Sequence, residues 1–194
     1  MKTPIVLAGL LLGSLAVAGC TPASHSQESG ELKEELEGLP AVVHVRVYYD
    51  EPELLDSAKV DLDVTMDEDA TPDQVSAVVE AAYDGLTDAH VKEEGNLVVG
   101  FGDDKLYLRT FESEAETDDV AAAALAGAVV AADRRRADIS LMTQDVEQAP
   151  HVDSVVRLRL PHGTDASEVD RVTKSIEQTF DDLAVDVDIR IARR

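Results

Sequence analysis

Two stretches of this chain, 97 residues apart, carry the same pattern of apolar residues at helical spacing. The matching residues are Val75, Val79, Tyr83 and Leu86 in the first stretch, and Val172, Ile176, Phe180 and Leu183 in the second. Each helix follows a segment of alternating apolar residues, Val60, Leu62 and Val64 or Val156, Leu158 and Leu160. Alternation with period two predicts a half-buried strand, and spacing of three and four predicts an amphipathic helix. The two patterns together require sheets that bury one face under helices.

The complete pattern predicts an α+β fold. In the first half we expect a helix at 31–37, strands at 43–49 and 60–66, a helix at 71–86, and strands at 97–101 and 106–111. In the second half we expect a helix at 117–136, strands at 139–141 and 156–160, a helix at 164–183 and a last strand at 185–191. We interpret this order as two αββαβ repeats, 31–114 and 115–194, each a small sheet with helices packed on one face. The stretch 120–132 is apolar nearly all round and should form the most buried helix.

The single cysteine, Cys20, follows a short apolar run near the start of the chain. Lys2 precedes the run, and the small residues Ala18 and Gly19 follow it, as in a secretory signal. The sequence Val17-Ala18-Gly19-Cys20 resembles the lipobox of bacterial lipoproteins. The resemblance implies a signal peptide at 1–19, a diacylglycerol on Cys20, and a lipidated, flexible tether at 20–30. It places the protein on the extracytoplasmic face of a cell membrane, anchored through the lipid on Cys20. The alternatives are an ordinary cleaved signal peptide and an uncleaved anchor helix.

Charge limits the possible partners. The chain has 40 Asp and Glu against 17 Lys and Arg, a net charge of −23, with a globular hydrophobic content of 44%. Nucleic acid binding depends on basic side chains that neutralise phosphates, so this class of function is excluded. An anionic lipid surface would also repel the folded part. We expect an envelope protein with a basic surface as the partner.

Several residue clusters in the sequence are candidates for a functional site. The acidic stretch 61–73 has alternating apolar residues and no glycine, unlike a calcium loop, so we expect a solvated strand face and turn. His151 and His162 lie at opposite ends of a strand and should not share a metal ion. His44 should lie on the polar face of its strand near Arg46, which we expect to pair with Asp61 or Asp63. We therefore assign no metal, cofactor or catalytic residue.

No hydrolase motif of the G-x-S-x-G or H-E-x-x-H kind occurs in the sequence. The order of elements is similar to the ring-building modules of bacterial secretion systems and, less closely, to BON domains. This resemblance of topology implies a non-catalytic binding or scaffold module of the cell envelope. An acidic domain that binds cations weakly and an envelope enzyme with converging carboxylates are the alternatives.

Overall fold

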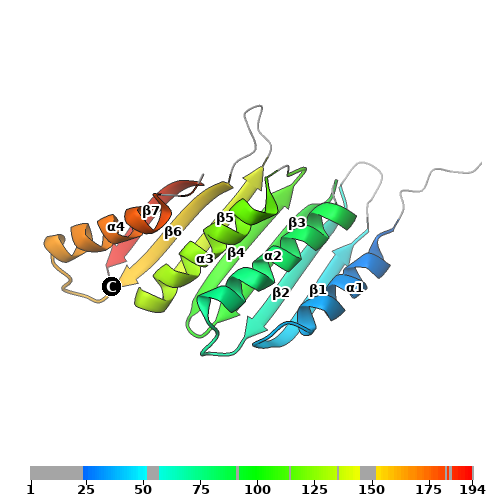
Figure 1. The fold of residues 1–194 in the computed structure, drawn as a ribbon, viewed down its shortest axis with the longest axis horizontal. Helices are drawn as coiled ribbons and strands as arrows, with labels where there is room; N and C mark the ends of the chain where they lie inside the picture. Colours follow the sequence, from blue (N-terminus) through cyan, green and yellow to red (C-terminus); the bar gives the residue numbers. More distant parts are fainter. Residues whose placement is uncertain are drawn as a thin grey trace, which may run out of the picture.

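The computed structural model describes residues 24–51, 57–90, 92–113, 115–134, 136–144, 152–181, 183 and 185–193. Within these ranges, helices and strands follow one another in the order helix, strand, strand (Figure 1). The elements are α1 (Ser26–Glu37), β1 (Val42–Asp50), β2 (Lys59–Met66), α2 (Pro72–Ala89), β3 (Glu94–Phe101), β4 (Asp104–Phe111), α3 (Thr117–Arg134), β5 (Ala137–Gln144), β6 (Val152–Leu160), α4 (Ala166–Phe180) and β7 (Val185–Arg193).

All seven strands form one sheet, and their order in space is their order in the chain. The pairs β1–β2, β3–β4 and β5–β6 are antiparallel. The pairs β2–β3, β4–β5 and β6–β7 are parallel, and α2, α3 and α4 connect them. The predicted α+β class, with helices packed against a sheet, is confirmed.

The expected division into two separate sheets is wrong. β4 pairs with β5 along nearly their full length, from Lys105 beside Asp138 to Phe111 beside Gln144. The proposed boundary near residues 112–117 therefore lies in a connection within one sheet. The repeating unit is also shorter than expected. It is one helix followed by two strands, seen in α1-β1-β2, α2-β3-β4 and α3-β5-β6, and α4 is followed by β7. The resemblance between the halves matches β2 with β6 and α2 with α4, two units apart.

Strand register places the apolar residues of neighbouring strands in continuous rows. Leu62 of β2 lies beside Leu97 of β3, which faces Leu108 of β4, which lies beside Leu141 of β5. All four are at most 2% exposed. The four helices cover this face, and the result is a two-layer structure with one core between helices and sheet (Figure 1).

Because all helices lie on one face, the connections differ in hand. Each hairpin reverses the strand direction, so β4 and β5 run opposite to β2 and β3 and to β6 and β7. The sheet nevertheless always grows in the same direction. The connection through α3 therefore has the opposite hand to those through α2 and α4. About 98% of such crossovers are right-handed, so this chain contains at least one of the rare class.

Local signals fix the ends of the elements. Thr71 accepts a hydrogen bond from the N–H of Gln74, and the Gln74 side chain accepts one from the N–H of Thr71, a capping box that starts α2. Gly102, with φ of 57°, turns the chain between β3 and β4 at the expected position.

The expected flexible tether at 20–30 is partly wrong, because residues from Ser26 onward are helical. The N–H of His25 donates to the Tyr49 hydroxyl, and Ser29 is buried, so the start of α1 is held against the fold.

Helix α3 lies between α2 and α4 and approaches the sheet closely, as the predicted burial of 120–132 requires. A Cβ at Gly127 would lie 2.7 Å from Cγ2 of Ile139 on β5. This contact is shorter than packed carbon atoms tolerate, and a β-branched side chain has little freedom at χ1 to move away. The glycine therefore sets the distance between α3 and the sheet.

We expect Gly127→Ala to lower the free energy of unfolding by roughly 1–3 kcal/mol through overpacking. Urea denaturation measures the effect. Gly30→Ala is the matched control, because Gly30 lies in the exposed part of α1 with no atom within 4 Å of an added Cβ. There the change should stabilise the protein by about 0.5–1 kcal/mol. Equal stability of the two variants would contradict the close contact.

Candidate functional site

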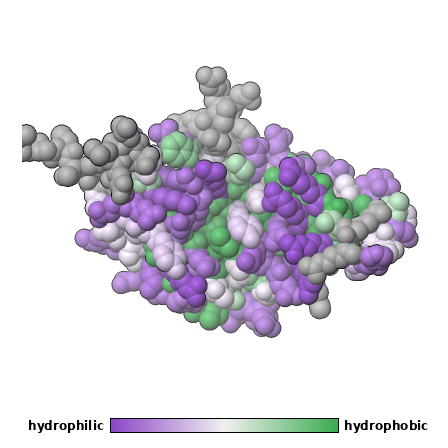
Figure 2. Space-filling view, turned by 180° about the vertical axis from the view of Figure 1, so that it is seen from behind, coloured by the Kyte–Doolittle hydropathy of each residue, from purple (hydrophilic) through white to green (hydrophobic). Residues whose placement is uncertain are grey.

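The face of the sheet opposite the helices carries no other element among the described residues (Figure 1). Along each strand, the residues between the core positions point to this side. We call it the uncovered face. Seen from behind, it shows apolar surface near its centre with polar surface around it (Figure 2). Two exposed large hydrophobic side chains lie on it, Tyr48, 60% exposed, and Met142, 37% exposed.

The charges on the uncovered face nearly cancel. It carries seven basic residues, Arg46, Lys59, Lys105, Arg109, Arg157, Arg159 and Arg190, on the strands that the structure describes. It also carries eight acidic residues there, Asp50, Asp61, Asp63, Glu94, Asp138, Asp153, Asp186 and Asp188. The four helices instead contain fifteen acidic residues and only four basic ones. Among the helices and strands, the net negative charge is therefore carried by the helices and not by the uncovered face.

One hollow of about 450 Å³ lies on the uncovered face across β1 to β4. We call it the Tyr48 hollow, and it is lined by Tyr48, Asp61, Leu62, Asp63, Asn96, Val98, Lys105 and Tyr107. Its carboxylates are already engaged. Arg46 lies 3.8 Å from Asp63, the cross-strand pair that the sequence predicted, and Lys59 lies 3.3 Å from Asp61. The Asn96 amide also donates to Asp61 at 3.0 Å.

A second hollow of about 220 Å³ lies beside it and is lined by Glu94, Arg109, Phe111, Met142 and Thr143. We call it the Met142 hollow. The Arg109 guanidinium lies 3.4 Å from the Glu94 carboxylate and neutralises its charge. The Asn96 amide, which lines the Tyr48 hollow, also donates to Glu94. Aromatic and thioether groups with neutralised charges around them are the composition found at the centre of protein interfaces.

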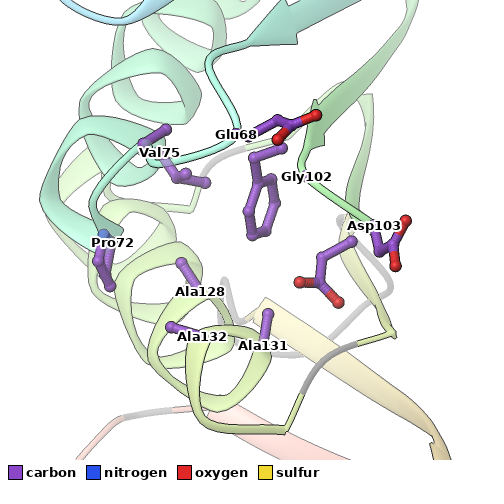
Figure 3. A pocket seen from close by; sticks show the side chains of 11 residues that line it. Glu68, Pro72, Val75, Gly102, Asp103, Ala128, Ala131 and Ala132 are labelled. Atoms are coloured by element: carbon purple, nitrogen blue, oxygen red, sulfur yellow. The ribbon is translucent and has the colours of Figure 1, made fainter.

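A different pocket, of about 510 Å³, opens on the helical side at one end of the sheet. Ala128, Ala131 and Ala132 of α3 line one wall with Pro72 and Val75 of α2, and Glu68 and Asp103 lie on the opposite side (Figure 3). The rest of the lining is Ala70, Phe101, Gly102 and Asp104. Three carboxylates thus share one pocket, although Asp103 also lies 3.5 Å from the Arg136 guanidinium.

Asp104 is the buried member of this group, only 9% exposed. Its carboxylate accepts a hydrogen bond of 2.6 Å from the N–H of Ala137 at the start of β5. Burial raises the pKa of Asp104 above its ordinary value of 3.8, and the backbone hydrogen bonds offset this only in part. The side chain therefore joins the β3–β4 turn to β5 at a cost in charge desolvation.

We expect Asp104→Asn to remove a pH dependence of stability. Because the pKa of Asp104 is raised on folding, the folded protein holds the Asp104 proton at pH values where the unfolded chain has lost it. The free energy of unfolding therefore falls as the pH rises from about 3.8 through the raised pKa of the folded state. The amide oxygen of Asn can still accept from Ala137, and the variant should gain stability relative to wild type between pH 4 and 7. Thermal unfolding across this range measures the difference. Asp69→Asn, in an exposed turn, is the control and should follow wild type; a parallel Asp104→Asn profile would contradict the assignment.

The structure places most of the sequence-predicted residues as expected. The acidic stretch 61–73 forms most of β2, an exposed turn at Asp67 to Asp69, and the start of α2. His44 is exposed on β1 opposite Thr65, and His162 lies in the turn after β6. His151 and Cys20, with the lipobox, lie outside the described residues.

Three residues that the sequence analysis did not group come together. His25 before α1 and His90 and Glu93 after α2 place a nitrogen or oxygen each within 4.8 Å of one another. We call them the His25 cluster. It is the only group of three His, Cys or carboxylate donors this close in the part of the chain that the structure describes. The signal available in the sequence was the spacing of His90 and Glu93, three residues apart.

No family model matches this chain, and no curated protein sequence matches it. None of the helices in the described ranges is both long and apolar enough to cross a bilayer.

Proposed function

We propose that this protein is a lipid-anchored, non-catalytic binding or scaffold module on the extracytoplasmic face of a bacterial cell membrane, and that its uncovered face binds an envelope protein. The observation that carries the proposal is the contrast between the two sides of the molecule. The helical side is strongly acidic, whereas the uncovered face combines neutralised charges with exposed aromatic and apolar groups.

The contrast has a physical consequence for association. Burying an unpaired carboxylate in an interface is costly, because the charge loses its hydration. On the uncovered face Asp61, Asp63 and Glu94 already have cationic or amide partners within the sheet. A partner can therefore cover Tyr48, Tyr107 and the Met142 side chain without leaving these acids unpaired. The net charge of −23 would attract a partner with a basic surface before contact.

The anchor is the second part of the proposal. Its support is the order of a charged start, an apolar run, two small residues and Cys20 in the sequence. The acidic helical side would be repelled by anionic lipid headgroups within about 8–10 Å. Attachment through a lipid on Cys20 gives the protein a membrane location that its folded surface does not itself favour.

We test the contact first. A photo-crosslinking amino acid in place of Tyr48 or Met142, in cells that make the full chain, should capture one discrete envelope protein. The same amino acid in place of Val129, 39% exposed on the helical side, is the matched control and should not capture it. Val98→Asp would place a new carboxylate in the apolar part of the Tyr48 hollow and should reduce capture at least tenfold. Equal capture from Val129, or full capture with Val98→Asp, would contradict the proposed surface.

We test the anchor separately. Cys20→Ala should release the protein from membranes or leave it with its first 19 residues, because no thiol remains to receive lipid. Membrane fractionation and gel mobility measure this, with Thr21→Ala as the control that keeps the thiol. Normal processing and unchanged membrane association of Cys20→Ala would refute the lipid.

One observation favours a second candidate, an envelope enzyme that uses carboxylates. Glu68, Asp103 and Asp104 line one pocket, and Asp104 is an acid with a raised pKa, as general acids often are. Against it, Asp104 holds the N–H of Ala137 and Asp103 lies beside Arg136. Turnover of an envelope substrate that Asp104→Asn abolishes, with the fold intact, would favour the enzyme over the binding module.

A further inference from the structure

The His25 cluster joins three parts of the chain that are distant in sequence. His25 precedes α1, whereas His90 caps the end of α2 and Glu93 precedes β3. Tyr49 of β1 closes one side, because its hydroxyl donates to Glu93 Oε1 at 3.0 Å. The cluster is thus held by the first helix, the first strand and the α2–β3 connection.

Burial distinguishes this cluster from the surface charges. His90 is 2% exposed and Glu93 is 8% exposed, whereas the His25 side chain is 34% exposed. A buried histidine and a buried carboxylate require partners, because desolvated polar groups are costly when unpaired. His90 Nδ1 contacts Glu93 Oε2, and His90 Nε2 lies 3.4 Å from the Ser29 hydroxyl.

One polar atom has no such partner. Nδ1 of His25 is buried and makes no hydrogen bond with any residue that the structure describes. It lies 3.2 Å from Oε1 of Glu93, an oxygen that already accepts from Tyr49. An unsatisfied nitrogen directed at a carboxylate, beside a second imidazole, is an arrangement that a cation completes.

The donor set and spacing select the kind of cation. Two imidazole nitrogens and one carboxylate oxygen are ligands of zinc and related transition metals, whereas calcium and magnesium prefer oxygen alone. Ligands about 2.0–2.1 Å from one tetrahedral ion lie roughly 3.3 Å from each other, close to the 3.2 Å between His25 Nδ1 and Glu93 Oε1. All three donor atoms lie within 4.8 Å of one another.

We infer that His25, His90 and Glu93 form a binding site for a divalent transition metal of the zinc class. Ser29 and Tyr49 hydrogen-bond to two of the three ligands, His90 and Glu93, and orient them, as outer partners commonly do. The exposed side of His25 leaves a path for the ion. Binding would fasten the start of α1 to the α2–β3 connection.

The test is a titration of the full chain, extracted in detergent and freed of metal by a chelator. Zn²⁺ in calorimetry should bind with one ion per chain, and Co²⁺ should give the visible absorption of a tetrahedral nitrogen and oxygen site. Zn²⁺ should also raise the melting temperature. Excess Ca²⁺ should not displace it, because calcium disfavours imidazole ligands.

Two variants identify the site without changing the buried His90. His25→Ala and Glu93→Gln should each weaken Zn²⁺ binding at least tenfold. His44→Ala is the matched control, because His44 is exposed on β1, away from the cluster, and should bind as wild type. Circular dichroism confirms that the variants fold. Unchanged affinity in both cluster variants, displacement by Ca²⁺, or no saturable Zn²⁺ binding by wild type would overturn the inference and leave a hydrogen-bonded cluster only.

Discussion

Burial of one face of the sheet is the constraint on which the rest of this structure depends. From β2 to β6 every strand presents its apolar residues to the same side, and the register aligns them in rows such as Leu62, Leu97, Leu108 and Leu141. A connecting helix can then bury its apolar residues only by packing against that side of the sheet. This requirement overrides the usual preference for right-handed connections, because a right-handed crossover at every step would move alternate helices to the other face. Close packing at Gly127 is part of the same solution.

The sequence predicted the elements well because the information is local. Alternation marks β2 and β6, Thr71 caps α2, and Gly102 turns β3 into β4. It did not predict that β4 and β5 pair, because periodicity shows which face of a strand is buried but not which strand lies beside it. The same limit hid the His25 cluster: His25 lies in a polar stretch that looks like a linker, and only the fold brings it to His90.

The uneven distribution of charge follows from the same fold. On the strands, acidic and basic residues alternate with apolar ones, and pairing across strands such as Arg46 with Asp63 neutralises them. On the helices the outward residues have few cationic neighbours, and α2 has no basic residue. A single sheet with helices on one side only therefore separates the acidic helical side from the nearly neutral uncovered face.

The agreement between strand order and chain order has a further consequence for how such a protein can change. Each strand pairs only with the strands before and after it, as the units of a solenoid contact only their neighbours. Duplication of one helix and its two following strands would extend the row at an edge without rearranging any existing pair. The uncovered face would become wider by two strands with each addition. Because each strand pairs only with the strands next to it in sequence, such a chain can also begin to fold from several places along its length.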